Sequence, residues 1–100
     1  MIRITKTFTR PSANVDFWFS TPQGAAFGAY REATYGAHLS SPEAYLTPDM
    51  LTWTYSVTWD SQESYDAMLA DPVIKEAMAE YEAYNFVHGI TDTENQIVTV

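Results

Sequence analysis

In the segment MLTWTYSVTW at 50–59, the residues from Leu51 to Trp59 alternate strictly between two kinds of side chain. Neighbouring side chains of a β-strand point to opposite faces, so this segment predicts a strand with two very different faces. One face is large and apolar, and the other is small and hydroxylated. The apolar face must be covered by other parts of the chain, whereas the hydroxyl face can meet solvent, a wet cavity or a second sheet. The apolar face consists of Leu51, Trp53, Tyr55, Val57 and Trp59.

Three further segments are predicted as strands. Residues 2–9 alternate in the same way, with Ile2, Ile4, Lys6 and Phe8 on one face. Residues 38–47 form another strand, which Pro42 restricts to a sheet edge or a bulge because proline cannot donate to the ladder. Residues 95–100, NQIVTV, form a last strand that runs to the end of the sequence.

A first helix is predicted between the first two strands. Ser20 begins it, in a capping-box pattern with Pro22 in the first turn, and Gly36 ends it as the residue after the helix. The helical period gives it an inner stripe of Ala26, Phe27, Tyr30, Ala33, Thr34 and Ala37.

Two glycines lie one turn apart in that helix, at Gly24 and Gly28. Each weakens the helix by about 1 kcal/mol relative to alanine. The missing side chains should therefore allow something else, which is either close packing on the sheet or room for a ligand.

A second helix follows the strand at 50–59. Asp60 or Ser61 caps it, and Glu63 lies three residues after Asp60, where its side chain can bond back to the Asp60 N–H as in a capping box. The Asp71-Pro72 step interrupts it, and Asp71 can cap the second part. Gly89 ends it. Its apolar period runs through Tyr65, Met68, Leu69, Val73, Ala77, Tyr81 and Tyr84.

The element order is therefore strand, helix, strand, strand, helix, strand. This order predicts an α+β fold of the ferredoxin-like βαββαβ type, with a four-stranded antiparallel sheet in a single domain over residues 1–100. Two helices cover one face of such a sheet and leave the other face open. A second copy of the chain can cover it, so we expect a homodimer.

The charge balance limits the possible partners. The formal net charge is −8, from 13 acidic and 5 basic residues, which disfavours nucleic acid and anionic membrane surfaces. The sequence has no cysteine and no apolar run near the length of a membrane span. We expect a cytoplasmic protein with no nucleic-acid partner, no membrane association and no metal site.

The strand end and helix at 59–78 resemble a known family. Trp59-Asp60-Ser61-Gln62-Glu63-Ser64-Tyr65, then Leu69 and Asp71-Pro72-Val73-Ile74-Lys75-Glu76-Ala77, are similar to the strand-to-helix segment of the dimeric α/β-barrel superfamily. The similarity is greatest to its antibiotic-biosynthesis-monooxygenase branch. The resemblance implies homodimers with a pocket between sheet and helices. It also implies functions that range from cofactor-free oxygenation and haem degradation to no known activity.

This sequence departs from the haem-degrading members at their functional positions. Where those members place a Trp and a His on the second helix, this chain has Met68 and Met78, and its first strand contains no Asn. Methionines at core-facing positions usually fill gaps. The departure argues against haem degradation and keeps the pocket apolar, so we expect no cofactor.

Two histidines and one arginine are the candidate polar groups. His38 and His88 each follow or end a predicted helix, where they can cap it. His38 can alternatively act as a general base at the mouth of a pocket. Arg31 can pair with Glu32 on the surface or with a ligand carboxylate.

The large aromatic residues allow two interpretations. Trp53, Tyr55 and Trp59 can form the core or line a cavity. Trp18, at 15–19 in the connection after the first strand, can form a lid over the pocket or a dimer contact. The predicted ligand-binding residues are Trp18, Phe27, Tyr30, Arg31, Trp53, Tyr55, Met68 and Met78, with His38 as the candidate catalytic residue.

Two functional hypotheses follow from these patterns. In the first, the sheet–helix pocket binds an apolar aromatic or acyl molecule and can carry out monooxygenase-like chemistry without a cofactor. In the second, the protein is a dimeric interaction module whose own side chains fill the pocket.

Overall fold

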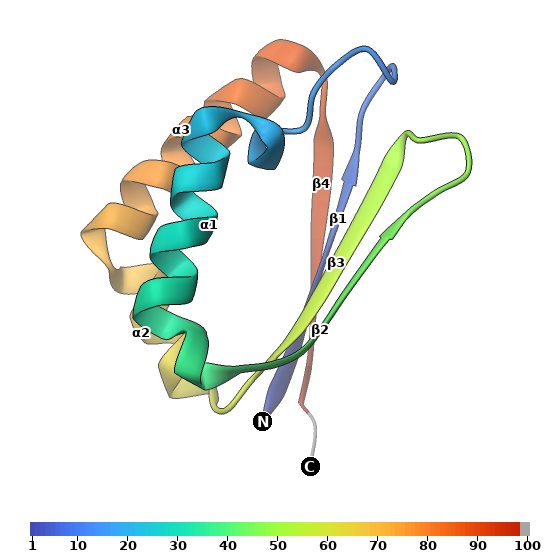
Figure 1. The fold of residues 1–100 in the computed structure, drawn as a ribbon. Helices are drawn as coiled ribbons and strands as arrows, with labels where there is room; N and C mark the ends of the chain where they lie inside the picture. Colours follow the sequence, from blue (N-terminus) through green and yellow to red (C-terminus); the bar gives the residue numbers. More distant parts are fainter. Residues whose placement is uncertain (99–100) are drawn as a thin grey trace.

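The structure is a computed structural model, and it describes residues 1–98. Strands and helices follow one another in the predicted order (Figure 1). The elements are β1 (Ile2–Thr9), the short 3₁₀ helix η1 (Trp18–Ser20), α1 (Pro22–Tyr35), the 3₁₀ helix η2 (Gly36–His38), β2 (Leu39–Leu46), β3 (Thr52–Trp59), α2 (Gln62–Ala70), α3 (Pro72–His88) and β4 (Thr91–Val98).

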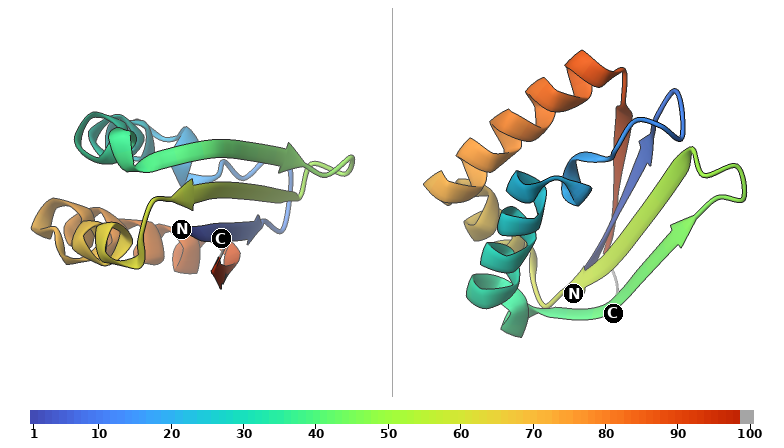
Figure 2. Two further views of the ribbon diagram at one scale, coloured as in Figure 1. Left: turned by 90° about the horizontal axis from the view of Figure 1, so that it is seen from below. Right: turned by 45° about the horizontal axis from the view of Figure 1, so that its top comes forward.

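The four strands form one antiparallel sheet in the order β2-β3-β1-β4. All three α-helices lie on the same face of this sheet, which leaves the opposite face without a covering helix among the described residues (Figures 1 and 2). This arrangement confirms the α+β, ferredoxin-like fold class. No helix within residues 1–98 is long and apolar enough to cross a bilayer.

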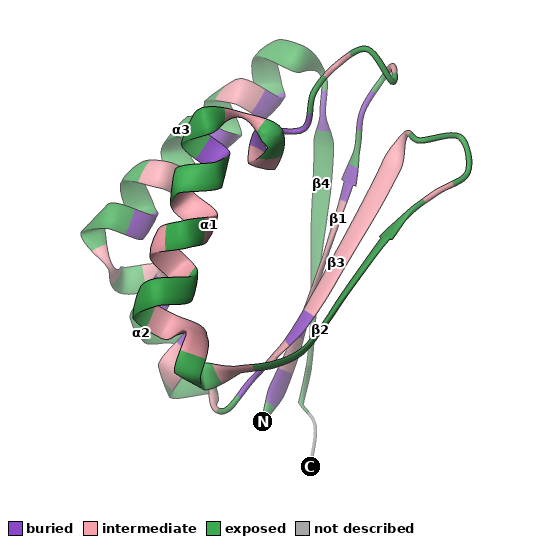
Figure 3. Ribbon diagram, viewed as in Figure 1, coloured by how far each residue is buried: buried purple, intermediate pink, exposed green. Residues whose placement is uncertain are grey.

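The two central strands carry the predicted alternation. Their inner side chains are buried or half-buried, whereas β2 and β4 at the edges are mostly exposed (Figure 3). On the outer face, hydroxyl groups of β1 and β3 pair across the strands: Thr5 with Ser56 at 2.8 Å and Thr9 with Thr52 at 3.2 Å. Such pairs are among the contacts that stabilise neighbouring strands.

The prediction for the first helix was wrong at its start and right at its end, since α1 ends at Tyr35 and Gly36 follows it. Thr21 rather than Ser20 is the capping residue, and its hydroxyl accepts a hydrogen bond from the Gly24 N–H at 3.1 Å. Gly36 does not adopt the left-handed conformation expected after a helix, since its φ is −55° and the chain continues into η2. A helix that tightens into a 3₁₀ turn satisfies its last carbonyls without a left-handed residue.

The inner face of α1 also differs from the predicted stripe. Ala26, Ala33, Thr34 and Ala37 are exposed. Two of the residues that face the sheet instead are Gly24 and Arg31, and neither belongs to an apolar pattern. The largest apolar residues, Phe27 and Tyr30, are half-buried as predicted. The small residues were assigned to the inner face wrongly, because alanine and threonine occur on either face of a helix.

The break between α2 and α3 is confirmed. Ser61 caps α2, and Asp71 caps α3 by accepting from the Val73 N–H at 2.9 Å. Because the helix restarts at Pro72, its helical phase shifts. Val73, predicted to face inward, is 49% exposed, and Ile74 is completely buried instead.

The carboxylate of Asp71 also joins α1 to this break. It accepts hydrogen bonds from the hydroxyls of Tyr35 at 2.6 Å and Tyr30 at 2.7 Å. These two bonds, that from Tyr35 first, lower the pKa of Asp71 below its ordinary value, and the same contact raises the pKa of Tyr35 to about 12. The ionised carboxylate therefore links α1 to the start of α3.

Asp71→Asn is expected to lower the melting temperature near neutral pH, and the loss should shrink in acid. A carboxyl group whose pKa is lower in the folded state stabilises the fold above its unfolded pKa of about 4, and that stabilisation disappears as the pH falls through the folded value. Thermal melts of both proteins from pH 7 to pH 2.5 measure this. Glu82→Gln, at an exposed position of α3, is the control and should leave the wild-type pH profile unchanged. A pH-independent gap for Asp71→Asn would contradict the assignment.

Both edge strands contain features that the sequence placed incompletely. Pro42 in β2 coincides with a register shift between Ser40 and Glu43, and Ser41 has a φ of 51°, so the predicted bulge is confirmed. β4 begins at Thr91 rather than at residue 95, and residues 99–100 of the predicted strand lie outside the described residues. Gly89, with φ of 71°, ends α3 as predicted.

Candidate functional site

A cavity of about 200 Å³ lies between the inner face of the sheet and the helices. It lies where two groups of buried residues meet, one around Trp59 and Ile4 and one around Phe8 and Trp18. Its lining is dominated by aromatic and aliphatic side chains. The lining residues are Ile4, Lys6, Phe8, Phe17, Trp18, Phe19, Gly24, Phe27, Gly28, Arg31, Trp53, Tyr55, Val57, Trp59, Tyr65, Met68, Leu69, Ala77, Met78, Tyr81, Asn85 and Glu94.

The two glycines of α1 have different roles at this cavity. A Cβ atom on Gly24 would lie 2.5 Å from the Cα of Phe19 and 2.7 Å from the carbonyl carbon of Trp18, so α1 packs directly on the backbone of η1 there. A Cβ atom on Gly28 would have no neighbour within 4 Å. Gly24 therefore permits close packing, onto η1 rather than onto the sheet, whereas Gly28 leaves open space in the cavity.

The connection after β1 closes one end of the cavity. Phe17 and Trp18 are only 5% and 7% exposed, so both side chains belong to the interior. Trp18 packs edge-on against Tyr81 with ring centroids 5.7 Å apart, and the Arg10 guanidinium covers Phe17 at 4.4 Å. This placement at the cavity end fits the lid interpretation of the segment.

Arg31 reaches into the cavity from α1. Its Nη2 donates to the Tyr55 hydroxyl at 3.0 Å, and its guanidinium lies 5.3 Å from the centre of that ring. Its Nε is buried and has no hydrogen-bond partner. Within the described residues Arg31 makes no ion pair with Glu32, so the surface pairing considered from the sequence is not formed.

Lys6 and Glu94 place opposite charges at the β1–β4 side of the cavity. The Lys6 Nζ lies 3.9 Å from Glu94 Oε1, and the Tyr65 hydroxyl donates to the same oxygen at 2.7 Å. Burial first, and then Glu94, raise the pKa of Tyr65 far above its ordinary value. Tyr65 therefore stays protonated near neutral pH and acts as a hydrogen-bond donor. Glu94 is the one carboxylate that lines the cavity within residues 1–98.

A second tyrosine lies beside this pair. The hydroxyl of Tyr81 donates to Asp92 of β4, and burial followed by this contact raises the pKa of Tyr81. Asn85, one turn further along α3, is 5% exposed; its amide partly offsets the rise in the pKa of Tyr81, but its Nδ2 has no partner within hydrogen-bond distance. Neither Tyr65 nor Tyr81 can therefore serve as a base near pH 7.

The structure brings most of the predicted ligand-binding residues to the cavity. Tyr30 is the exception: its hydroxyl binds Asp71, and its ring contributes to a shallower groove between α1 and α3. The predicted residues that do line the cavity are Trp18, Phe27, Arg31, Trp53, Tyr55, Met68 and Met78.

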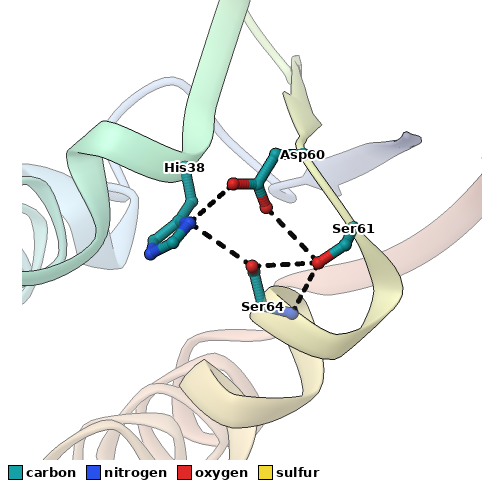
Figure 4. Close-up of polar contacts among 4 residues, drawn as sticks. All are labelled: His38, Asp60, Ser61 and Ser64. Atoms are coloured by element: carbon teal, nitrogen blue, oxygen red, sulfur yellow. Dashed lines mark hydrogen bonds and ion pairs between the residues drawn. The ribbon is translucent and has the colours of Figure 1, made fainter.

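His38 does not belong to the cavity lining. It lies at the end of η2, 45% exposed, where its Nδ1 is 2.6 Å from Asp60 Oδ2 and 3.3 Å from the Ser64 hydroxyl (Figure 4). Ser64 first, and then His38, lower the pKa of Asp60. In a Ser-His-Asp triad the serine and the carboxylate bind opposite ring nitrogens. Here both bind Nδ1, so the cluster connects η2 to the start of α2 and lacks triad geometry.

His88 lies in the last turn of α3 and packs against Tyr84, with ring centroids 4.1 Å apart and ring planes at 39°. No group of three or more potential metal-binding side chains occurs within residues 1–98.

Sequence reasoning missed Lys6, Glu94, Tyr65 and Asn85 as site residues. Lys6 had a visible signal, because it interrupts an otherwise apolar strand face, and a charge there must find a partner. Glu94 had none, since it precedes the segment predicted as the last strand. Asn85 had no signal either, because the helical period of this segment identifies inward positions only by their apolar residues.

No protein-family model matches the chain, and no curated protein matches its sequence. SnoaB, a cofactor-independent oxygenase from Streptomyces nogalater, is similar over 99% of this chain and 92% of its own, with a TM-score of 0.64 and 12% identity. An antibiotic biosynthesis monooxygenase is similar over 100% and 99%, with a TM-score of 0.65 and 12% identity. The chain has the fold of the antibiotic biosynthesis monooxygenases.

The resemblance identified from residues 59–77 is thereby confirmed at the level of fold. A conserved protein of unknown function from Bacteroides thetaiotaomicron shares this fold as well, with a TM-score of 0.67 and 8% identity over 96% of this chain and 94% of that one. At such identities a common fold does not establish a common reaction. The chemistry has to be argued from the cavity of this chain.

Proposed function

We propose that the protein binds a small aromatic molecule in the cavity and oxidises it with dioxygen, without a cofactor. The observation that carries this proposal is a cavity lined by aromatic rings that also contains one carboxylate, Glu94, and two cationic side chains, Lys6 and Arg31. Apolar walls take up an aromatic body, and a few polar groups fix its orientation. The similarity of the fold to SnoaB, a cofactor-independent oxygenase, supports the proposal.

Glu94 is the proposed general base. A phenolic substrate gives its proton to the Glu94 carboxylate, and the electron pair stays on the substrate as a phenolate. The Lys6 ammonium lies beside Glu94 and stabilises the negative charge on the phenolate oxygen of the substrate. Tyr65 holds the carboxylate in place by its hydrogen bond of 2.7 Å.

The phenolate then supplies electrons to dioxygen. A bond forms between the ring carbon opposite the phenolate oxygen and one oxygen atom, and the peroxide takes up the proton from Glu94. Loss of the hydrogen from that carbon as a proton, with cleavage of the O–O bond, releases water and leaves a quinone. The balance is one phenol and one dioxygen to one quinone and one water.

The substrate class is small and aromatic because of the cavity itself. Its volume of about 200 Å³ is below the 300–1,000 Å³ usual for drug-sized ligands, which suits one or two fused rings. Arg31 remains the proposed partner for an acidic group of the ligand, through its free Nε. His38 has no proposed role in the chemistry, since it lies outside the lining.

The open face of the sheet is the proposed dimer contact. Its hydroxyl rows are flanked by exposed apolar residues on the edge strands, including Tyr45 at 60% and Ile97 at 52% exposure. A second copy packed on this face would cover them. Sedimentation that gives a monomer at micromolar concentration would contradict this part of the proposal.

Wild-type protein is expected to consume dioxygen with 1-naphthol and to form 1,4-naphthoquinone in equal molar amounts. An oxygen electrode and the quinone absorbance measure the two quantities. Hydrogen peroxide should not accumulate, because the second oxygen atom leaves as water. Peroxide formed in place of quinone, or no uptake above the buffer rate, would contradict the oxygenase proposal.

Gly28→Leu is expected to weaken the binding of 1-naphthol by at least about tenfold. The leucine side chain would enter the open space over Gly28 and displace roughly 60 Å² of apolar contact, which corresponds to about 1.5 kcal/mol. Isothermal titration of both proteins measures the affinity. Gly28→Ala is the matched control, because one methyl group leaves most of the space free. Equal affinity for all three proteins would place the ligand elsewhere, or favour the interaction module that binds no small molecule.

A further inference from the structure

The two buried donors without partners lie on different helices of the same cavity. Arg31 Nε belongs to α1 and Asn85 Nδ2 to α3, and both residues line the cavity. A buried N–H group that makes no hydrogen bond costs free energy, so native proteins leave few of them. Each of these two atoms can donate a hydrogen bond but cannot accept one. A group that satisfies either atom must therefore offer a hydrogen-bond acceptor.

The donors are also held over different strands. Arg31 is fixed against Tyr55 of β3 by the hydrogen bond of 3.0 Å. Asn85 follows Tyr81 by one helical turn, and the Tyr81 hydroxyl binds Asp92 of β4. Since β1 lies between β3 and β4, the two strands are about 10 Å apart. The two donors can therefore form hydrogen bonds to two separate groups of one ligand.

Asn85 is almost completely buried. Only 5% of the residue is exposed, and its position in α3 is fixed by the backbone bond from the Ile90 N–H to the Asn85 carbonyl at 2.9 Å. An apolar residue there would avoid the cost of an unpaired amide. The polar side chain is consistent with a ligand group that fills this position.

We infer that the ligand carries two hydrogen-bond acceptor groups separated by an aromatic body, a carboxylate or phenolate at Arg31 and a carbonyl oxygen at Asn85. This inference rests on the proposed function, because it describes the substrate class of the same cavity. Asn85 is the specificity-determining residue for the second group. A carbonyl at that end is recognised by the amide N–H, and an alkyl group of the same shape leaves the amide unpaired.

The test compares two probes of similar size. One is 6-acetyl-2-naphthoate, and the other is 6-isopropyl-2-naphthoate, in which the carbonyl oxygen is replaced by a methyl group. Wild-type protein is expected to bind the acetyl compound about tenfold more tightly, as the gain from one buried hydrogen bond predicts. Asn85→Leu should abolish or reverse that preference and should bind the isopropyl compound at least as well as wild type.

A second measurement separates this role from a structural one. Ligand-free Asn85→Leu is expected to melt at or above the wild-type temperature, because it removes an unpaired polar group from the interior. A structural amide would lower the melting temperature on replacement. Asn85→Met, which is longer and more flexible, serves the same purpose if the leucine variant does not fold.

The outcomes distinguish this inference from the proposed function. Binding of both probes with the same affinity in wild type and variant would overturn the role of Asn85 while leaving the cavity as a binding site. If neither of the probes nor 1-naphthol binds to wild-type protein, the proposed function is overturned, and this inference with it.

Discussion

Glu94→Gln is expected to lower the rate of 1-naphthol oxidation by about 100-fold or more, while the affinity for 1-naphthol changes little. Glutamine keeps the shape of the side chain and can still accept the hydrogen bond from Tyr65, but it cannot take a proton at neutral pH. General bases contribute roughly 100- to 10,000-fold to reaction rates. Oxygen uptake at saturating substrate gives the rate, and titration gives the affinity.

Asp92→Asn provides the matched control for this result. Asp92 lies on the same strand two residues away and accepts from Tyr81 as Glu94 accepts from Tyr65, but it does not line the cavity. Its replacement should leave the rate within a few-fold of wild type. Equal losses in the two variants would point to general damage to β4, and an active Glu94→Gln protein would require another base.

Gly24→Ala is expected to destabilise the protein by about 3 kcal/mol, near the upper end for overpacking. The new Cβ would lie 2.5 Å from the Phe19 Cα, and a backbone atom cannot move aside as a flexible side chain can. The start of α1 and the segment that closes the cavity would have to separate. For a domain of about 100 residues this corresponds to a fall in the melting temperature of roughly 12–24 °C.

Gly28→Ala, one turn further along the same helix, should have the opposite effect. Its Cβ meets nothing within 4 Å, so alanine gains helix propensity of about 0.5–1 kcal/mol without a clash. Urea unfolding of both variants measures the two changes in the free energy of unfolding. Destabilisation of similar size in both would mean that backbone conformation, and not contact with η1, explains the glycine at position 24.

The fold was largely predictable because its signals are local. The alternation of residues 2–9 and 50–59, the proline in the edge strand and the Asp71-Pro72 restart each depend on residues close together in the chain. Predictions failed where the signal was absent. β4 carries Asp92, Glu94 and Gln96 on its inner face, so no apolar period marks its beginning. Tyr81 and Tyr65 bind its two acids, and Gln62 is bonded to Gln96.

The site was predictable only in its apolar part. Large aromatic and methionine residues must go inside, so Trp18, Trp53, Met68 and Met78 could be assigned to a pocket from residue type and period alone. The polar groups could not. Lys6, Arg31, Asn85 and Glu94 come from four different elements, and their residue types are common on protein surfaces. His38 attracted interest as a histidine, yet its contacts are with Asp60 and Ser64 outside the cavity.

The sequence by itself determined the element order and the apolar character of one sheet face. Only the tertiary structure decided which glycine packs and which leaves space, and which charges lie in the cavity. The physical reason is range. Alternation, capping and proline geometry act over a few residues, whereas Lys6 and Glu94 meet only because β1 and β4 pair across nearly the whole length of the chain.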